Sequence, residues 1–152
     1  MAQLSFFLKL EGVTGSATQK GYEGSIPIDS FSWSESAAFN PVTAEGSLPE
    51  VKPLSLVAPV GRDGPTLLTT AFERQSIASA TLTVLSVAAT GQPTRIATIK
   101  LADMHVTSYQ FAASTATDRL LEQFELTARR ISLTRHIGGQ TYTGEIDLSA
   151  LG

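Results

Sequence analysis

The chain has 152 residues, of which 42% are hydrophobic, 16% are charged and none is cysteine, and its formal net charge at pH 7 is −3. These values predict a single domain over residues 1–152, and they exclude a disordered polymer and a coiled coil. The acidic balance argues against nucleic-acid binding, and the missing cysteines exclude disulfides, cysteine-based zinc sites and thiol catalysis.

The charged fraction is low for the surface of a monomer. Solvated surfaces carry about 25–35% charged residues, whereas charged residues are depleted at the cores of protein interfaces. Extensive self-association would suit this composition. A β-protein whose polar surface is mainly serine and threonine accounts for the composition equally well.

The first residues predict a β-strand. Apolar side chains fall on alternate positions: Leu4, Phe6, Leu8 and Leu10. A period of two is typical of a strand with one buried face. The segment lacks the basic n-region of a secretory signal peptide, and no run in the chain approaches the roughly 18 apolar residues of a membrane span.

A second strand is predicted over residues 24–34. Its alternation changes phase, with even-numbered isoleucines followed by odd-numbered aromatics: Ile26, Ile28, Phe31 and Trp33. A side-chain period of two cannot place all four on one face without an extra residue. A β-bulge near residues 29–30, or a strand buried on both faces, would resolve the change, and either suits a barrel or a sandwich corner.

Regular alternation fails over residues 36–57, which contain three prolines and keep many apolar side chains. Loops longer than about 12–15 residues inside compact domains are usually functional or disordered. We therefore expect a long irregular arm that docks on a neighbouring molecule, or, as the alternative, a lid folded back on its own barrel. The candidate interface residues are Phe39, Asn40, Pro41, Val42, Leu48, Glu50 and Lys52.

Residues 64–74 contain the one predicted helix. Pro65 suits the first helical position, where its missing N–H costs nothing, and Asp63 or Gly64 can supply the cap. The apolar stripe predicted to pack on the barrel consists of Leu67, Leu68, Ala71 and Phe72. A fully buried phenylalanine here would cost about 3–5 kcal/mol on replacement by alanine.

The rest of the sequence predicts an antiparallel meander with strands over 78–90, 95–113, 119–137 and 140–148. Hairpin turns are indicated at residues 91–93 and 138–139, whereas the polar break at 114–118 has no glycine and leaves its turn type open. The fold class predicted is mainly β: two antiparallel sheets forming a β-barrel-like domain, with one short flanking α-helix and a long extended loop.

No residue set completes a catalytic, metal or cofactor site. Asp103 and His105 share a strand face, as in a metal half-site or a base with its orienting acid, but no nearby histidine or cysteine completes it. Ser108 is expected on the opposite face and lacks a strained nucleophile elbow. Nothing in the sequence places Glu122 and Glu125 across a cleft. We therefore predict a protein that is not an enzyme.

A series of short motifs runs along nearly the whole chain, at residues 6–16, 20–26, 31–34, 65–68, 80–84, 100–109 and 124–131. In this order they resemble the hemolysin-coregulated protein (Hcp) family, the ring-forming tube proteins of type VI secretion. The chain departs from the family pattern at Ser25, where glutamate is common, and at Ser34-Glu35, which replaces the usual Trp-Gly step.

The resemblance implies a single tube domain that forms homo-hexameric rings, which stack into a hollow tube inside a contractile sheath and under a spike. It further implies assembly in the cytoplasm, secretion without a signal peptide, a lumen that holds small effectors, and no catalysis, cofactor, nucleic acid or membrane insertion. The arm would then contact a stacked ring or a neighbouring subunit.

Two other classes remain open at this point. A contractile phage or phage-like tail tube protein has a related fold and the same mechanical role. A small β-barrel binding protein would instead be a monomer with an apolar cavity, so the oligomeric state separates it from both tube proteins.

Overall fold

The computed structural model describes residues 3–36, 39–43, 45–46, 50–59, 61, 64–88, 91, 93–115 and 119–147. This part of the chain is mostly β-strand, as predicted. In chain order the elements are β1 (Gln3–Leu10), β2 (Ile26–Ile28), β3 (Ser30–Ser32), β4 (Glu35–Ser36), β5 (Phe39–Asn40), β6 (Glu45–Gly46), β7 (Glu50–Val51), β8 (Leu54–Pro59), α1 (Gly64–Glu73), β9 (Ser76–Val87), β10 (Pro93–Ser114), β11 (Arg119–Ile137) and β12 (Gln140–Asp147).

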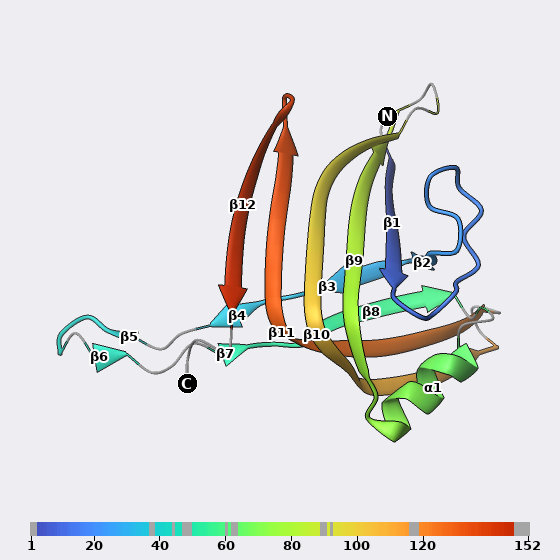
Figure 1. Cartoon of the computed structure of the whole chain (residues 1–152), viewed down its shortest axis with the longest axis horizontal. Helices are drawn as coiled ribbons and strands as arrows, with labels where there is room; N and C mark the ends of the chain where they lie inside the picture. The colour runs from blue at the N-terminus through green and yellow to red at the C-terminus, as the bar shows by residue number, and fades with distance from the viewer. Residues whose placement is uncertain are drawn as a thin grey trace.

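One curved antiparallel sheet forms the barrel, with strand order β2-β1-β9-β10-β11-β8-β3 and with β12 paired to β11. The long strands β10 and β11 have 22 and 19 residues and bend from an upright wall into the floor of the barrel (Figure 1). The C-terminal half of β11 pairs with β12 in the wall, and its N-terminal half pairs with β8 in the floor. The two predicted sheets are therefore two halves of one continuous sheet.

The sheet nearly closes at Asp29. This residue separates β2, which pairs with β1 at one end of the sheet, from β3, which pairs with β8 at the other end. Its backbone N–H donates to the Val57 carbonyl over 2.8 Å. The strand predicted over residues 24–34 is thus two strands, and the phase change is a corner at Asp29 rather than a β-bulge within one strand, because the chain crosses here from one sheet edge to the other.

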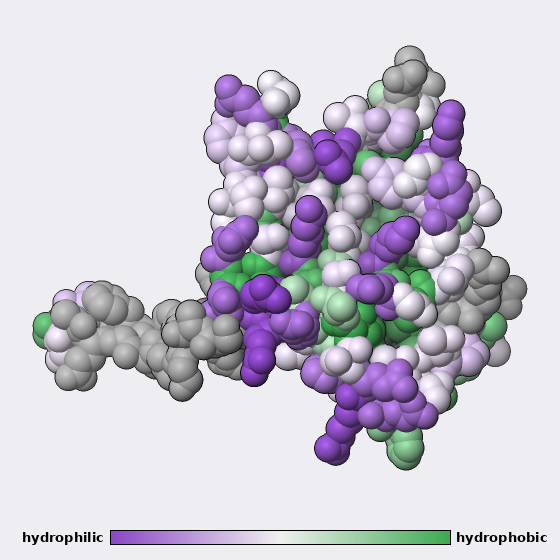
Figure 2. All heavy atoms as spheres, in the orientation of Figure 1, coloured by the Kyte–Doolittle hydropathy of each residue, from purple (hydrophilic) through white to green (hydrophobic). Residues whose placement is uncertain are grey.

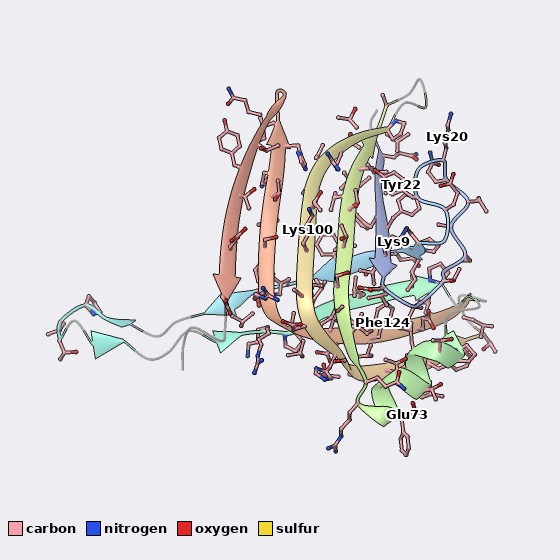
Figure 3. All side chains as sticks on the ribbon, in the orientation of Figure 1. Lys9, Lys20, Tyr22, Glu73, Lys100 and Phe124 are labelled. Atoms are coloured by element: carbon pink, nitrogen blue, oxygen red, sulfur yellow. The ribbon has the colours of Figure 1, made fainter. Side chains whose placement is uncertain are left out.

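The core fills the inside of this barrel. Phe124, whose position is labelled in Figure 3, is fully buried in the floor. Around it lie buried aliphatic side chains from the wall and the floor, among them Leu8, Leu10, Ile26, Leu56, Leu82, Leu101, Met104 and Leu126. On β1, Leu8 and Leu10 are buried as expected, whereas Leu4 is exposed because it lies above the core.

The helix α1 lies against the lower end of the barrel (Figure 1), and half of its predicted apolar stripe packs there: Leu67 is buried and Ala71 is partly buried against the core. The buried residues are Gly64, Leu67 and Thr70, whereas Leu68 is 55% exposed and Phe72 is 87% exposed. The reason is the close approach of the first turn: a Cβ on Gly64 would lie 2.9 Å from the Glu122 carboxylate. Because only a glycine fits against Glu122, the Gly64 side of the helix packs on the barrel. Phe72 lies on the side that faces solvent.

The arm between β3 and β8 is a β-hairpin rather than an irregular loop. β4 pairs with β7 and β5 pairs with β6, each over two residues. These pairs are too short to produce a visible alternation in the sequence. The labelled strands of the arm project away from the barrel instead of covering it as a lid (Figure 1).

The two glycines of the β11–β12 turn confirm the predicted hairpin. Gly138 and Gly139 have φ of 57° and 83°. Successive positive φ values are those of a type I′ turn, which matches the twist of the flanking strands. The helix found in the described part of the chain is too short to cross a membrane.

Candidate assembly surfaces

Except for Glu122, the residues considered for catalysis lie on the outside of the barrel. Asp103 and His105 share the outward face of β10, as predicted, and both are exposed. The Asp103 carboxylate accepts a hydrogen bond from Arg130 over 2.9 Å, and both side chains are more than half exposed. Exposed pairs of this kind contribute little to stability. Across the described residues, no group of three or more histidine, aspartate or glutamate side chains could hold a metal ion.

Ser108 does not lie where the strand period predicts. A register shift between Val106 and Ser108 makes Thr107 an extra residue, so Ser108 pairs with Glu125. Residues Thr107 and Ser108 therefore share the outward face with His105, and the expectation that Ser108 faces the other way is wrong. Among the described residues no hydrogen bond joins His105 and Ser108, and the open hollows that His105 lines do not include Ser108.

The two glutamates of β11 lie on opposite faces of the strand. Glu122 is fully buried and its Oε2 accepts a hydrogen bond from the Tyr109 hydroxyl over 2.8 Å. Glu125 points to the outer side, so the two carboxylates do not form the acid–base pair of a hydrolase. Glu122 instead anchors β11 to β10 beneath the start of α1. Its even position, in step with buried Phe124 and Leu126, was the sequence signal for this burial.

The outward face of the wall is rich in hydroxyl groups. One row crosses all five wall strands through the paired residues Phe7, Thr83, Thr98, Thr134 and Thr143; within it Thr83 and Thr98 are covered by their neighbours and buried. The hydroxyls of Thr134 and Thr143 lie 3.0 Å apart. The next row contains Lys9, Thr81, Lys100, Ser132 and Glu145. The same face is mostly white and purple in Figure 2, so serine and threonine supply much of the polarity that charges do not.

The wall ends in exposed strand edges. Among the described strands, β12 pairs only with β11, and residues 3–5 of β1 pair only with β9. A strand edge presents backbone N–H and C=O groups that can pair with another chain. The two edges lie on opposite sides of the same wall, so they suit a head-to-tail contact between copies.

In the part of the chain that the structure describes, large apolar side chains are exposed at three places. More than half of the surface is exposed for Leu4, Val42, Leu68, Phe72, Phe111, Leu120, Ile137 and Tyr142. They lie at the top of the wall, at the arm tip, and around α1 with the β10–β11 end. Contiguous exposed apolar surface marks interaction sites.

The candidate interface residues lie along the arm. Phe39 and Asn40 form β5, Pro41 and Val42 are exposed in the turn that follows, and Glu50 begins β7. Lys52 is exposed at the base of the arm, and its N–H donates to the Ser34 carbonyl over 2.9 Å. Leu48 lies outside the described residues.

A packed barrel, exposed strand edges and a projecting hairpin are the features of a structural subunit built to contact other chains. The sequence matches the model of the family described as "Type VI secretion system effector, Hcp" over residues 7–134. The chain belongs to this family, as the motifs predicted, and it has the role of a type VI secretion tube subunit. No curated protein matches the sequence significantly.

Several solved structures share the fold. Hcp1 from Salmonella typhimurium is 21% identical, with a TM-score of 0.82 over 99% of this chain and 97% of that one. A type VI secretion system effector from Yersinia pestis is 17% identical, with a TM-score of 0.78 over 93% and 98% of the two chains. Hcp3 from Pseudomonas aeruginosa is 16% identical, with a TM-score of 0.71 over 97% and 98%.

Proposed function

We propose that the chain forms homo-hexameric rings that stack into a hollow tube, and that it acts mechanically without catalysis. The family match over residues 7–134 carries this proposal. The tube would assemble in the cytoplasm inside a contractile sheath, carry a spike, and leave the cell through the type VI apparatus.

Ring closure is supported by the two edges of the wall. When the β12 edge of one copy meets the β1 edge of the next, each copy gives one surface and receives another, and such contacts form a ring if the rotation closes. The wall would then be continuous around the ring. Its hydroxyl-rich outward face would line a water-filled lumen able to hold small effectors.

The arm supplies a second contact, between stacked rings or with the neighbouring subunit. We assign this contact to Phe39, Asn40, Pro41, Val42, Leu48, Glu50 and Lys52. The hairpin holds its turn away from its own barrel, where another copy can reach it (Figure 1).

The other classes fit less well. A small-molecule carrier needs an apolar cavity, whereas side chains such as Phe124, Leu82 and Met104 fill the barrel interior. A phage-like tail tube protein shares the mechanical role, but the matching family model is that of type VI secretion.

The oligomeric state tests the proposal. Light scattering after size-exclusion chromatography should give six times the mass of the 16.1 kDa chain, and negative-stain images should show six-fold rings. Monomers alone at high protein concentration, with no rings on the grid, would overturn it.

A further inference from the structure

The end of the barrel beside α1 carries a shallow apolar groove of about 360 Å³, lined by Gly61, Gly64, Pro65, Leu68, Tyr109 and Phe111. None of these residues is charged. Leu68 and Phe111 are 55% and 58% exposed, so the groove presents apolar surface to water. Exposing apolar surface to water costs free energy, so a partner that covers the groove would be stabilised there.

The walls of the groove are fixed by buried contacts. Leu67 and Thr70 hold α1 on the barrel, which leaves Leu68 beside the groove. On the other side, the Tyr109 hydroxyl donates to the buried Glu122 carboxylate over 2.8 Å. The groove is therefore formed before any partner arrives, which lowers the entropy cost of binding.

The arm carries an apolar side chain of suitable size. Val42 lies in the turn between β5 and β6 and is 91% exposed, between exposed Pro41 and Thr43. The hairpin holds this turn away from the barrel, so the arm of a copy does not fill that copy's own groove (Figure 1).

We propose that the Val42 turn of one copy docks in the groove between α1 and β10 of a second copy. The inference rests on the proposed self-assembly and names the surface that the arm binds. The described residues that form the two surfaces are uncharged. Because they lie on different parts of the molecule, the contact is head-to-tail and repeats from copy to copy. One valine gives a weak contact, so the contact acts through its repetition in the assembly.

Disulfide crosslinking tests this contact directly, because the chain contains no cysteine. Val42→Cys and Leu68→Cys are combined in one chain, and the assembled protein is oxidised and run on a non-reducing gel. A disulfide forms only when the two Cα atoms come within about 7 Å. We expect a ladder of dimers and larger species that a reductant collapses to the monomer.

The matched control combines Val42→Cys with Gln123→Cys. Gln123 is exposed on the part of β11 that pairs with β8, outside the groove and away from the two wall edges that would close the ring. This variant should remain monomeric on the gel. A ladder of equal strength in the control would overturn the inference, because it would report random collision.

A second pair of variants checks the chemistry without cysteine. Val42→Asp should reduce the sedimentable tube fraction, because it places a charge against the apolar groove, whereas Val42→Ile should retain it. Circular dichroism confirms that both variants fold. Equal sedimentation of the two variants would contradict the inference.

The outcomes also separate this inference from the proposed function. If electron microscopy shows rings and tubes but the cysteine pair gives no ladder, another segment or protein covers the groove, and only the docking inference fails. If the unsubstituted chain forms neither rings nor tubes, both the docking inference and the proposed function fail.

Discussion

At the scale of single residues, Phe124 and Phe72 mark the two extremes of environment in this protein. Phe124 is fully buried in the barrel floor, whereas Phe72 leaves 87% of its surface in water on α1. Burial of apolar area determines what a side chain contributes to folding. The same residue type therefore has opposite energetic roles at the two positions.

Phe72→Ala should change the free energy of unfolding by less than about 0.5 kcal/mol, as is usual for surface positions. Phe124→Ala, the matched control, should cost about 3–5 kcal/mol because it leaves a cavity. Urea unfolding at one fixed protein concentration measures both, since assembly also stabilises the chain. A loss above about 2 kcal/mol for Phe72→Ala would show that the helix packs in the way its apolar stripe predicts.

Arg74 ends α1 in a left-handed conformation, with φ of 55°. Its N–H bonds to the Ala71 carbonyl and the Gln75 N–H bonds to the Thr70 carbonyl, as in a Schellman motif, where glycine is usual. Arg74→Gly removes the steric cost of a Cβ at positive φ and should stabilise the fold by about 0.5–1 kcal/mol. Thermal unfolding checks this, and an equal gain in Arg74→Ala, which keeps the Cβ, would contradict the explanation.

At the scale of elements, the loop after β1 depends on one glycine. Gly15 donates its N–H to the Gly24 carbonyl over 2.7 Å, and Ala17 donates to the Ser25 carbonyl over 2.9 Å. The Gly15 Cα lies so close to Ser25 that a Cβ would overlap the backbone carbonyl of that residue. This loop is therefore folded against itself and leads the chain into β2.

Gly15→Ala should destabilise the fold by about 1–3 kcal/mol, because a backbone contact cannot move aside easily. Gly144→Ala on β12 is the control, since no atom lies within 4 Å of the added Cβ. Denaturant unfolding of the two variants compares them. Similar stabilities would mean that the loop shifts without cost.

At the scale of the whole molecule, the barrel and the arm have separate roles. The barrel holds the core, whereas the arm is joined to it through β4 and β7 and extends outward (Figure 1). An exposed hairpin contributes little to the stability of the domain it leaves. It can contribute much to association, because it reaches a second copy.

Replacing residues 36–53 by a short Gly-Ser turn should leave the thermal unfolding temperature of the barrel nearly unchanged and should weaken tube assembly. Differential scanning calorimetry and sedimentation measure the two effects on the same protein. Normal tubes would show that the assembly role is wrong, and collapse of the barrel would show that the arm belongs to the core.

The sequence by itself determined the class of fold, the meander from β9 to β12, the existence of α1 and the family. These follow from local patterns: a period of two, turn glycines, a proline at the start of a helix, and motifs in a fixed order. It also located an irregularity at residues 29–30, because a phase change must be accommodated by the backbone, but not the division into two strands at opposite ends of the sheet.

Only the tertiary structure decided which face of α1 packs, on which side Ser108 lies, and that the arm is a hairpin. Each depends on how one segment meets another. Gly64 packs against Glu122, the pairing of β10 with β11 shifts at Thr107, and the backbone of β5 pairs with that of β6. Sequence patterns report how often apolar residues recur along one segment. They do not report which other segment packs against that one, and the packing partner determines which side chains are buried.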